Sequence, residues 1–93
     1  MTRHDILMKS DEIVNGSREQ DYGSPENNFK TISIMWNAYI KSVKRDHLEP
    51  YDVAAMLGLL KIARIAGGHN KEDNWIDLAG YAACGGELQN KDN

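Results

Sequence analysis

Hydrophobic residues recur three and four positions apart along most of the chain, a spacing that predicts α-helices. The strongest pattern covers residues 25–43. Ser24 is a good N-cap, Pro25 suits the first helical position, and Glu26 adds negative charge to the first turn. One apolar face is then made by Phe29, Ile32, Trp36, Tyr39, Ile40 and Val43.

A second helix, predicted over residues 50–66, begins with Pro50 and is apolar on nearly every side. A helix of this kind is usually buried in the middle of a bundle or an oligomer. We therefore expect it to be the central helix, with part of its surface covered by another copy of the chain.

Two further helices are predicted over residues 4–15, ending at Gly16, and over residues 70–86, ending at Gly85 and Gly86. Asn70 and Asp73 have the spacing of a capping box. No segment alternates with a period of two. The predicted fold is an all-α, oligomeric four-helix bundle. It forms one domain over residues 1–93, with helix 50–66 packed against helix 70–86 and a disordered tail over residues 89–93.

Composition narrows the possible partners and location. The 93 residues carry a net charge of −3, which disfavours general nucleic-acid binding because that normally needs a basic surface. The single cysteine, Cys84, excludes an internal disulfide and fits a reducing compartment. No apolar run approaches the ~20 residues that span a bilayer. We expect a cytoplasmic protein without a membrane partner.

Two cations interrupt the most apolar helix. On a helical wheel, Arg64 lies between Leu57 and Leu60, and Lys61 lies at the edge of the same stripe. A buried cation needs a carboxylate or a bound anion, because an unpaired buried charge is costly. Polar residues also share one strip of the last predicted helix: Asp73, Asn74, Asp77 and Tyr81.

An antiparallel pairing of these two helices would bring Lys61 and Arg64 near Asp77 and Tyr81. One interpretation is an internal salt bridge between Arg64 and Asp77. The other is a pocket in which the cations hold a phosphate while Asn74, Asp77 or Tyr81 contact the remaining ligand. The capping position of Asp73 is sufficient to explain that residue.

The loop before the helix that begins at Pro25 is the second candidate binding element. Arg18 and Tyr22 precede a helix N-terminus, where exposed backbone N–H groups favour anions, and the Tyr22 ring could stack on a base. The alternative is an ordered loop that only packs, with Arg18 and Asp21 paired locally. The three histidines and Cys84 lack the spacing of a zinc site, and no catalytic triad can be argued. We therefore predict no catalytic residue, metal or cofactor from spacing.

Four short sequence motifs of this chain, taken together, resemble those of a family of small uncharacterised proteins encoded mainly by tailed phages and prophages. That family reads R-x-x-D-Y-G-x-P-x-x-N-F, then W-x-A-Y, L-L-K-I-A-R and D-x-x-x-D-x-A-G-Y-A, and the match covers almost the whole chain. The resemblance implies phage origin and a location in the cytoplasm of an infected bacterial host. The residues that fall on motif positions are Arg18, Asp21, Tyr22, Gly23, Pro25, Phe29, Trp36, Tyr39, Lys61, Arg64, Asp73, Asp77 and Tyr81.

A looser similarity is to the all-α nucleotide pyrophosphohydrolases of the MazG type, which hold magnesium with E-x-x-E and E-x-x-D motifs. This chain departs from that pattern, since Lys61 and Arg64 stand where the second acidic motif is expected. If the chain were such a hydrolase, the similarity implies that Glu26, Asp73 and Asp77 would hold the magnesium.

Three functions follow as hypotheses. The first is a homo-oligomer that binds a small phosphorylated molecule, a nucleotide in particular, and sequesters an immune signalling nucleotide to counter host defence. Its ligand-binding residues would be Arg18, Tyr22, Lys61, Arg64, Asn74, Asp77 and Tyr81. The second is a magnesium-dependent MazG-like hydrolase, and the third is an interaction module that inhibits a host enzyme. The sequence favours a protein that is not an enzyme.

Overall fold

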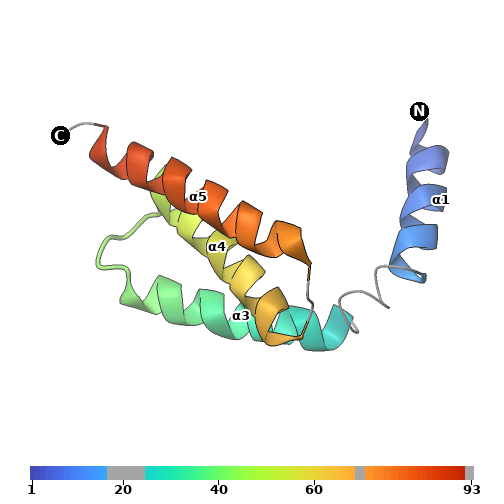
Figure 1. Ribbon diagram of the computed structural model, residues 1–93, viewed down its shortest axis with the longest axis horizontal. Coiled ribbons are helices and arrows are strands. Elements are labelled where there is room, and N and C mark those ends of the chain that lie inside the picture. The colour runs from blue at the N-terminus through green and yellow to red at the C-terminus, as the bar shows by residue number, and fades with distance from the viewer. Residues whose placement is uncertain (17–24, 69–70, 92–93) are drawn as a thin grey trace.

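The computed structural model describes residues 1–16, 25–68 and 71–91, and within these ranges the chain forms four helices (Figure 1). They are α1 (Arg3–Val14), α3 (Pro25–Ser42), α4 (Pro50–Ala66) and α5 (Glu72–Asn90). The described ranges contain no strand. The predicted all-α class is confirmed.

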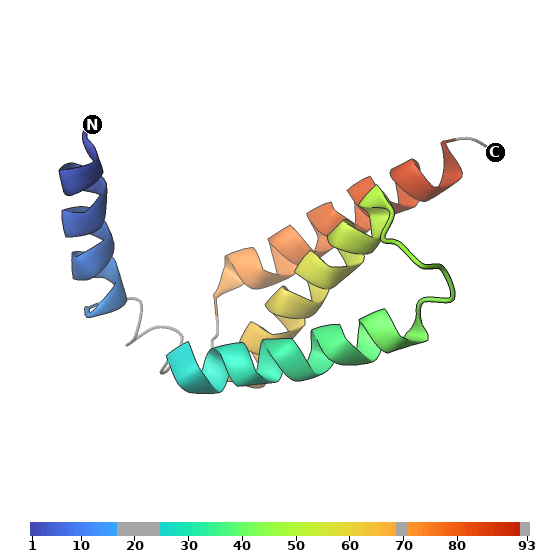
Figure 2. The ribbon, with the colours of Figure 1, turned by 180° about the vertical axis from the view of Figure 1, so that it is seen from behind.

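Helix α4 lies between α3 and α5 and packs against both (Figures 1 and 2). The short connection after Gly67 and Gly68 makes α4 and α5 antiparallel, and Gly68 takes a φ of 85°, a conformation that glycine adopts readily. The prediction of a central helix 50–66 packed against the last helix is confirmed. We call α3, α4 and α5 together the three-helix body.

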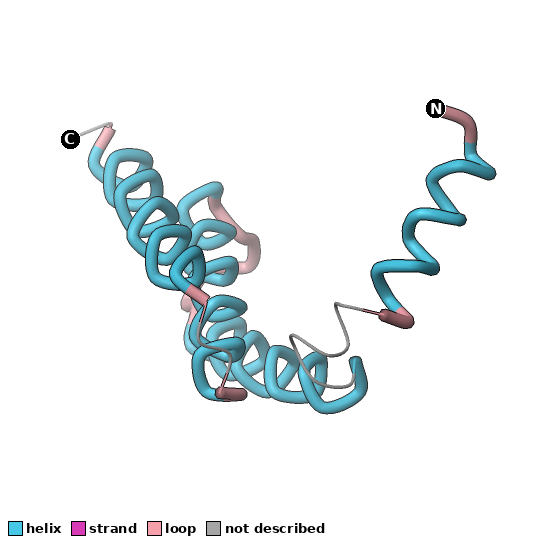
Figure 3. The backbone as a smooth tube through the Cα atoms, turned by 45° about the vertical axis from the view of Figure 1, so that its right-hand side comes forward, coloured by secondary structure: helices cyan, strands magenta, loops and turns pink. Residues whose placement is uncertain are grey.

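Helix α1 stands apart from the three-helix body (Figure 3). All of its residues are exposed. The radius of gyration, 15.7 Å, accordingly exceeds the ~12 Å expected for a compact domain of this length. Hydrogen bonds at its own N-terminus stabilise this helix. The Thr2 amide donates to Asp5 Oδ2 at 2.9 Å, and the Asp5 amide donates to Thr2 Oγ1 at 3.2 Å, forming a capping box.

The apolar core of the body is small. Among the described residues, only Ile32 and Ala63 are buried apolar side chains, whereas Asp52, Lys61 and Asn74 are buried polar ones. Helix α3 is fixed to α4 by a directional bond, because the Trp36 indole N–H donates to the Met56 carbonyl oxygen at 2.7 Å. Polar contacts therefore position these helices as much as apolar packing does.

Helix α5 is longer than predicted at its C-terminal end. It passes through Gly85 and Gly86 and ends at Asn90, so the predicted end at these glycines is wrong and residues 89 and 90 are helical. At Gly85 a Cβ atom would lie 3.0 Å from the Ala54 Cβ, so this glycine permits close contact with α4. Packing against α4 thus keeps the helix intact where local preference would end it.

The N-terminus of α5 also differs from the prediction. Its N-cap is Lys71, and the Asn74 amide donates to the Lys71 carbonyl at 3.1 Å. Asp73 therefore lies in the first turn, where its charge suits the helix dipole. Asn70, the predicted cap, and residues 92–93 of the predicted tail lie outside the described residues.

Substituting the two adjacent glycines of α5 tests the close contact. Gly85→Ala places a methyl group against Ala54, and we expect a net loss of about 1 kcal/mol in the free energy of unfolding. Gly86→Ala meets nothing within 4 Å, so we expect a gain of up to ~1 kcal/mol from helix propensity. Urea unfolding followed by circular dichroism measures both. An equal gain from the two substitutions would contradict the packing described here.

Candidate functional site

An ion pair joins α4 and α5 where the sequence predicted one. Lys61 Nζ lies 2.8 Å from Asp77 Oδ2. Lys61 is the buried partner, with 6% of its surface exposed, whereas 41% of the Asp77 side chain is exposed. Asp77 therefore forms its ion pair with Lys61, whereas the salt-bridge interpretation expected Arg64. The ammonium group is held inside the interface and the carboxylate at its rim.

Arg64 and Asn74 lie next to this ion pair. In antiparallel helices with Lys61 opposite Asp77, the residue three positions after Lys61 comes level with the residue three positions before Asp77. Those residues are Arg64, which is half-buried, and Asn74, which is fully buried at 0% exposure. We call Lys61, Arg64, Asn74 and Asp77 the α4–α5 polar cluster.

The helical wheel misjudged which cation is buried most deeply. It placed Arg64 at the centre of the apolar stripe and Lys61 at its edge, but Lys61 is the buried residue. The reason is that the antiparallel partner, α5, covers the side of α4 that carries Lys61 and Gly58. At Gly58 a Cβ atom would lie 3.3 Å from Leu78 Cδ1.

The remaining predicted site residues fall in three places. Tyr81 lies one turn after Asp77 and lines a groove between the helices, and Asp73 is exposed. Glu26 belongs to the first turn of α3, but its side chain is not among those described. Arg18 and Tyr22 lie outside the described residues. Among the described residues, no three His, Cys, Asp or Glu side chains form a group suited to a metal ion.

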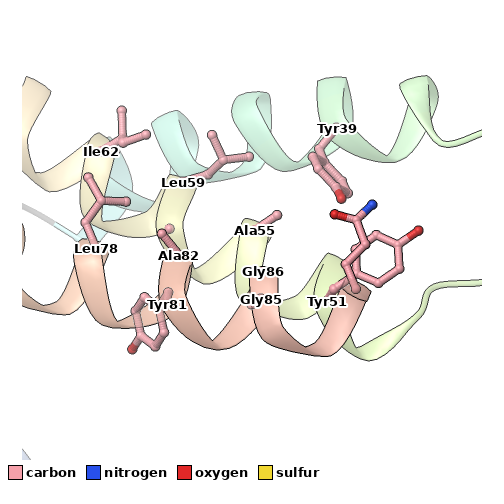
Figure 4. A pocket seen from close by; sticks show the side chains of 13 residues that line it. Tyr39, Tyr51, Ala55, Leu59, Ile62, Leu78, Tyr81, Ala82, Gly85 and Gly86 are labelled. Atoms are coloured by element: carbon pink, nitrogen blue, oxygen red, sulfur yellow. The ribbon is translucent and has the colours of Figure 1, made fainter. Parts of the chain in front are cut away.

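The groove that includes Tyr81 runs along α4, between α5 and the end of α3, and has a volume of about 350 Å³ (Figure 4). Side chains of Leu59, Ile62 and Leu78 line one end, and Tyr39 and Tyr51 line the other. None of the described residues that line it is charged. We call this cavity the α4 groove. The complete lining is Tyr39, Tyr51, Ala54, Ala55, Gly58, Leu59, Ile62, Leu78, Tyr81, Ala82, Gly85, Gly86 and Gln89.

A second polar network, which the sequence did not predict, is centred on the fully buried carboxylate of Asp52. Arg45 donates to both of its oxygens, at 2.9 and 3.1 Å, and the Tyr39 hydroxyl donates to Oδ1 at 2.5 Å. The Glu49 amide donates to Oδ2 at 2.7 Å. This network joins α3, the 43–49 loop and the first turn of α4. Arg45 also lies over the Tyr51 ring, with Cζ 5.3 Å from the ring centroid, and both Tyr39 and Tyr51 line the α4 groove.

The network shifts the proton equilibria of its members. The Arg45 guanidinium, followed by the Tyr39 hydroxyl, holds the pKa of Asp52 well below its usual range. The same hydrogen bond to Asp52 raises the pKa of Tyr39 to about 12. The signal for this site was present in the sequence. Asp52 is the third residue of the helix that begins at Pro50, a position where a carboxylate accepts from the N-cap amide.

His47, in the same loop, contacts two carboxylates through its two ring nitrogens. Its Nδ1 lies 2.8 Å from Asp46 Oδ1, and its Nε2 lies 2.7 Å from Glu49 Oε1. The contacts with these two carboxylates raise the pKa of His47, and the contact with Asp46 has the larger effect. Because the charged form is favoured in the folded state, this contribution to stability is present below the ordinary histidine pKa and is lost as the pH rises through the folded-state value.

The Asp52 network makes stability sensitive to acid. A carboxyl with a depressed pKa stabilises the fold above its unfolded-state pKa of about 3.9, and the contribution is lost as the pH falls below that value. We expect the urea midpoint to fall steeply between about pH 5 and pH 2. Asp52→Asn should lower the midpoint at pH 7 and flatten this dependence.

Asp73→Asn is the matched control, because Asp73 is exposed and lies outside the network. Its pH profile should follow that of the wild-type chain. An Asp52→Asn profile as steep as the wild-type one would contradict the role given to this carboxylate.

The fold and the site thus define a small all-α protein with a polar cluster buried between two antiparallel helices. The chain belongs to the family described as Domain of unknown function (DUF6378), whose model matches residues 5–89. It is similar to the Gene 55 protein of Mycobacterium phage L5, with 42% identity over 84 residues, which are 90% of this chain and 52% of that protein. No solved structure matches the chain.

The Gene 55 protein of Mycobacterium phage D29 is a second relative, 35% identical over 79 residues that cover 85% of this chain and 50% of that protein. The chain thus spans about half the length of the curated relatives it matches. These matches confirm the predicted likeness to phage proteins. The looser similarity to MazG-type hydrolases stays a prediction. No helix among the described residues is long and apolar enough to span a membrane.

Proposed function

We propose that this protein binds a small phosphorylated molecule, a nucleotide in particular, at the α4–α5 polar cluster. The observation that carries the proposal is the burial of Lys61 and Asn74 at an interface where apolar side chains would be expected. Burying polar groups costs free energy that apolar residues of similar size would not cost. A ligand that uses these groups gives a reason for keeping them.

The cluster offers the donors that phosphate recognition requires. Lys61 and Arg64 bring two cations to the cluster, and the Lys61 ammonium has three N–H donors, of which the Asp77 contact uses one. The guanidinium of Arg64 has the fork geometry that matches phosphate oxygens. The Asn74 amide can both donate and accept, so it can distinguish the groups attached to the phosphate.

The rest of the proposed ligand would extend toward solvent. Asp77 lies at the rim, and Tyr81 follows it by one turn, at a position where a ring could stack on a base. We also include Arg18 and Tyr22 in the proposed site, on the basis of the sequence motif alone. The phage relatives support a role in the cytoplasm of an infected host, where sequestering an immune signalling nucleotide would counter host defence.

Two other functions are weighed against this proposal. A hydrolase would need Asp77 to hold magnesium, and this carboxylate is in contact with the Lys61 ammonium, which opposes a bound cation. An interaction module that inhibits a host enzyme is favoured by the large exposed apolar side chains of the body, such as Phe29 and Trp75. The buried cluster is better explained by a ligand than by either function.

Lys61→Met separates binding from stability. Methionine fills the buried volume, and Asp77 is exposed enough to be rehydrated, so we expect the free energy of unfolding to change by no more than about 1 kcal/mol. Binding should weaken at least tenfold, because one charge-assisted hydrogen bond to phosphate is lost. Isothermal titration against a panel of linear and cyclic nucleotides measures binding, and urea unfolding measures stability.

Lys44→Met is the control, because Lys44 is an exposed lysine in the 43–49 loop and lies outside the cluster. It should bind as the wild-type chain does. Binding by Lys61→Met at wild-type affinity, or no binding of any panel member by the wild-type chain, would contradict the proposal. Magnesium-dependent release of pyrophosphate in the same samples would favour the hydrolase instead.

A further inference from the structure

Two apolar surfaces in the described part of the chain have no partner among the described residues, and they have similar lengths. One is the α4 groove, and the other is a face of α1. On a helical wheel of α1, Ile6, Leu7, Ile13 and Val14 lie on one side together with Arg3 and Ser10, and all of these residues are exposed. Charged residues such as Asp5, Lys9 and Glu12 lie on the other side of α1.

We propose that α1 of one copy docks in the α4 groove of a second copy, so that the chain exchanges its first helix and forms a dimer. The 12 residues of α1 make a helix about 18 Å long. The groove extends along α4 from Tyr51 to Ile62, which is about 17 Å at the same rise per residue. An amphipathic helix in an apolar groove of equal length is a recurring mode of recognition.

The floor of the groove suits a helix. Ala55, Ala82 and Gly86 are small, so a helix can approach the backbone of α4 and α5 closely. Ser10 lies in the middle of the apolar face of α1, and the residues that line the groove include tyrosines and Gln89, whose side chains carry groups able to form hydrogen bonds. No described charge in the groove would oppose burial.

A second copy is the occupant because α1 does not cover its own body in the single chain. It stands apart from α3, α4 and α5, although its capping box keeps it helical (Figures 1 and 3). The body also has little apolar core of its own, with only Ile32 and Ala63 buried among the described residues. A helix from a second copy would add a fourth helix to the three-helix body and enlarge its apolar core.

Three variants of the full chain test the exchange by light scattering on a sizing column. The wild-type chain should elute with the mass of a dimer. The double variant Ile6→Asp/Ile13→Asp should elute as a monomer, because two charges enter the apolar face of α1. Gly86→Arg should do the same from the groove side, where an added Cβ atom meets nothing within 4 Å in the single chain. Met8→Asp, on the other side of α1, should remain a dimer.

Cross-linking identifies the copy that supplies the helix. With Cys84→Ser in every chain, Ile13→Cys and Ala82→Cys are placed first on separate chains and then together on one chain. The mixture of separate chains should form a disulfide-linked dimer. A monomer with an internal disulfide in the double variant, without cross-linked dimers in the mixture, would show that α1 covers its own groove and would overturn the proposal. A wild-type monomer, or a dimer that survives both Ile6→Asp/Ile13→Asp and Gly86→Arg, would overturn it as well.

Discussion

The carboxylate of Asp52 fixes how the body of this protein is assembled. It accepts hydrogen bonds from Arg45, from the Tyr39 hydroxyl and from the Glu49 amide, and thereby joins the end of α3, the following loop and the start of α4. Because a buried carboxylate without these donors would be strongly disfavoured, the three segments are constrained to one arrangement. That arrangement sets the direction of α4, and with it the positions of Lys61 and of the α4 groove.

Polar contacts take over much of the positioning that a large apolar core usually provides. The Trp36–Met56 hydrogen bond and the Lys61–Asp77 ion pair each act between two helices at a defined point. Directional contacts of this kind specify one register, whereas apolar packing tolerates several. Large apolar side chains of the body, such as Trp75 and Ile76, meanwhile remain exposed.

Part of the candidate site could be predicted from the spacing of polar residues along the helices. The strip of Asn74, Asp77 and Tyr81 and the two cations of α4 were predicted to meet, and the structure brings Lys61 and Asp77 together. The wheel misassigned the buried cation because it averages over an isolated helix, while the burial of Lys61 depends on which side α5 covers. The Asp52 network was missed for a similar reason: Arg45 and Tyr39 reach it from segments that periodicity does not connect.

The sequence by itself determined the helices, their approximate bounds and the central place of α4, because these follow from the spacing of apolar residues and from the prolines at helix starts. It also determined the likeness to small phage proteins. Only the tertiary structure decided that α5 continues through Gly85 and Gly86, that Lys61 and not Arg64 lies deepest, and that α1 stands outside the body. Each of these depends on contacts between segments distant in sequence, and a local pattern does not contain that information.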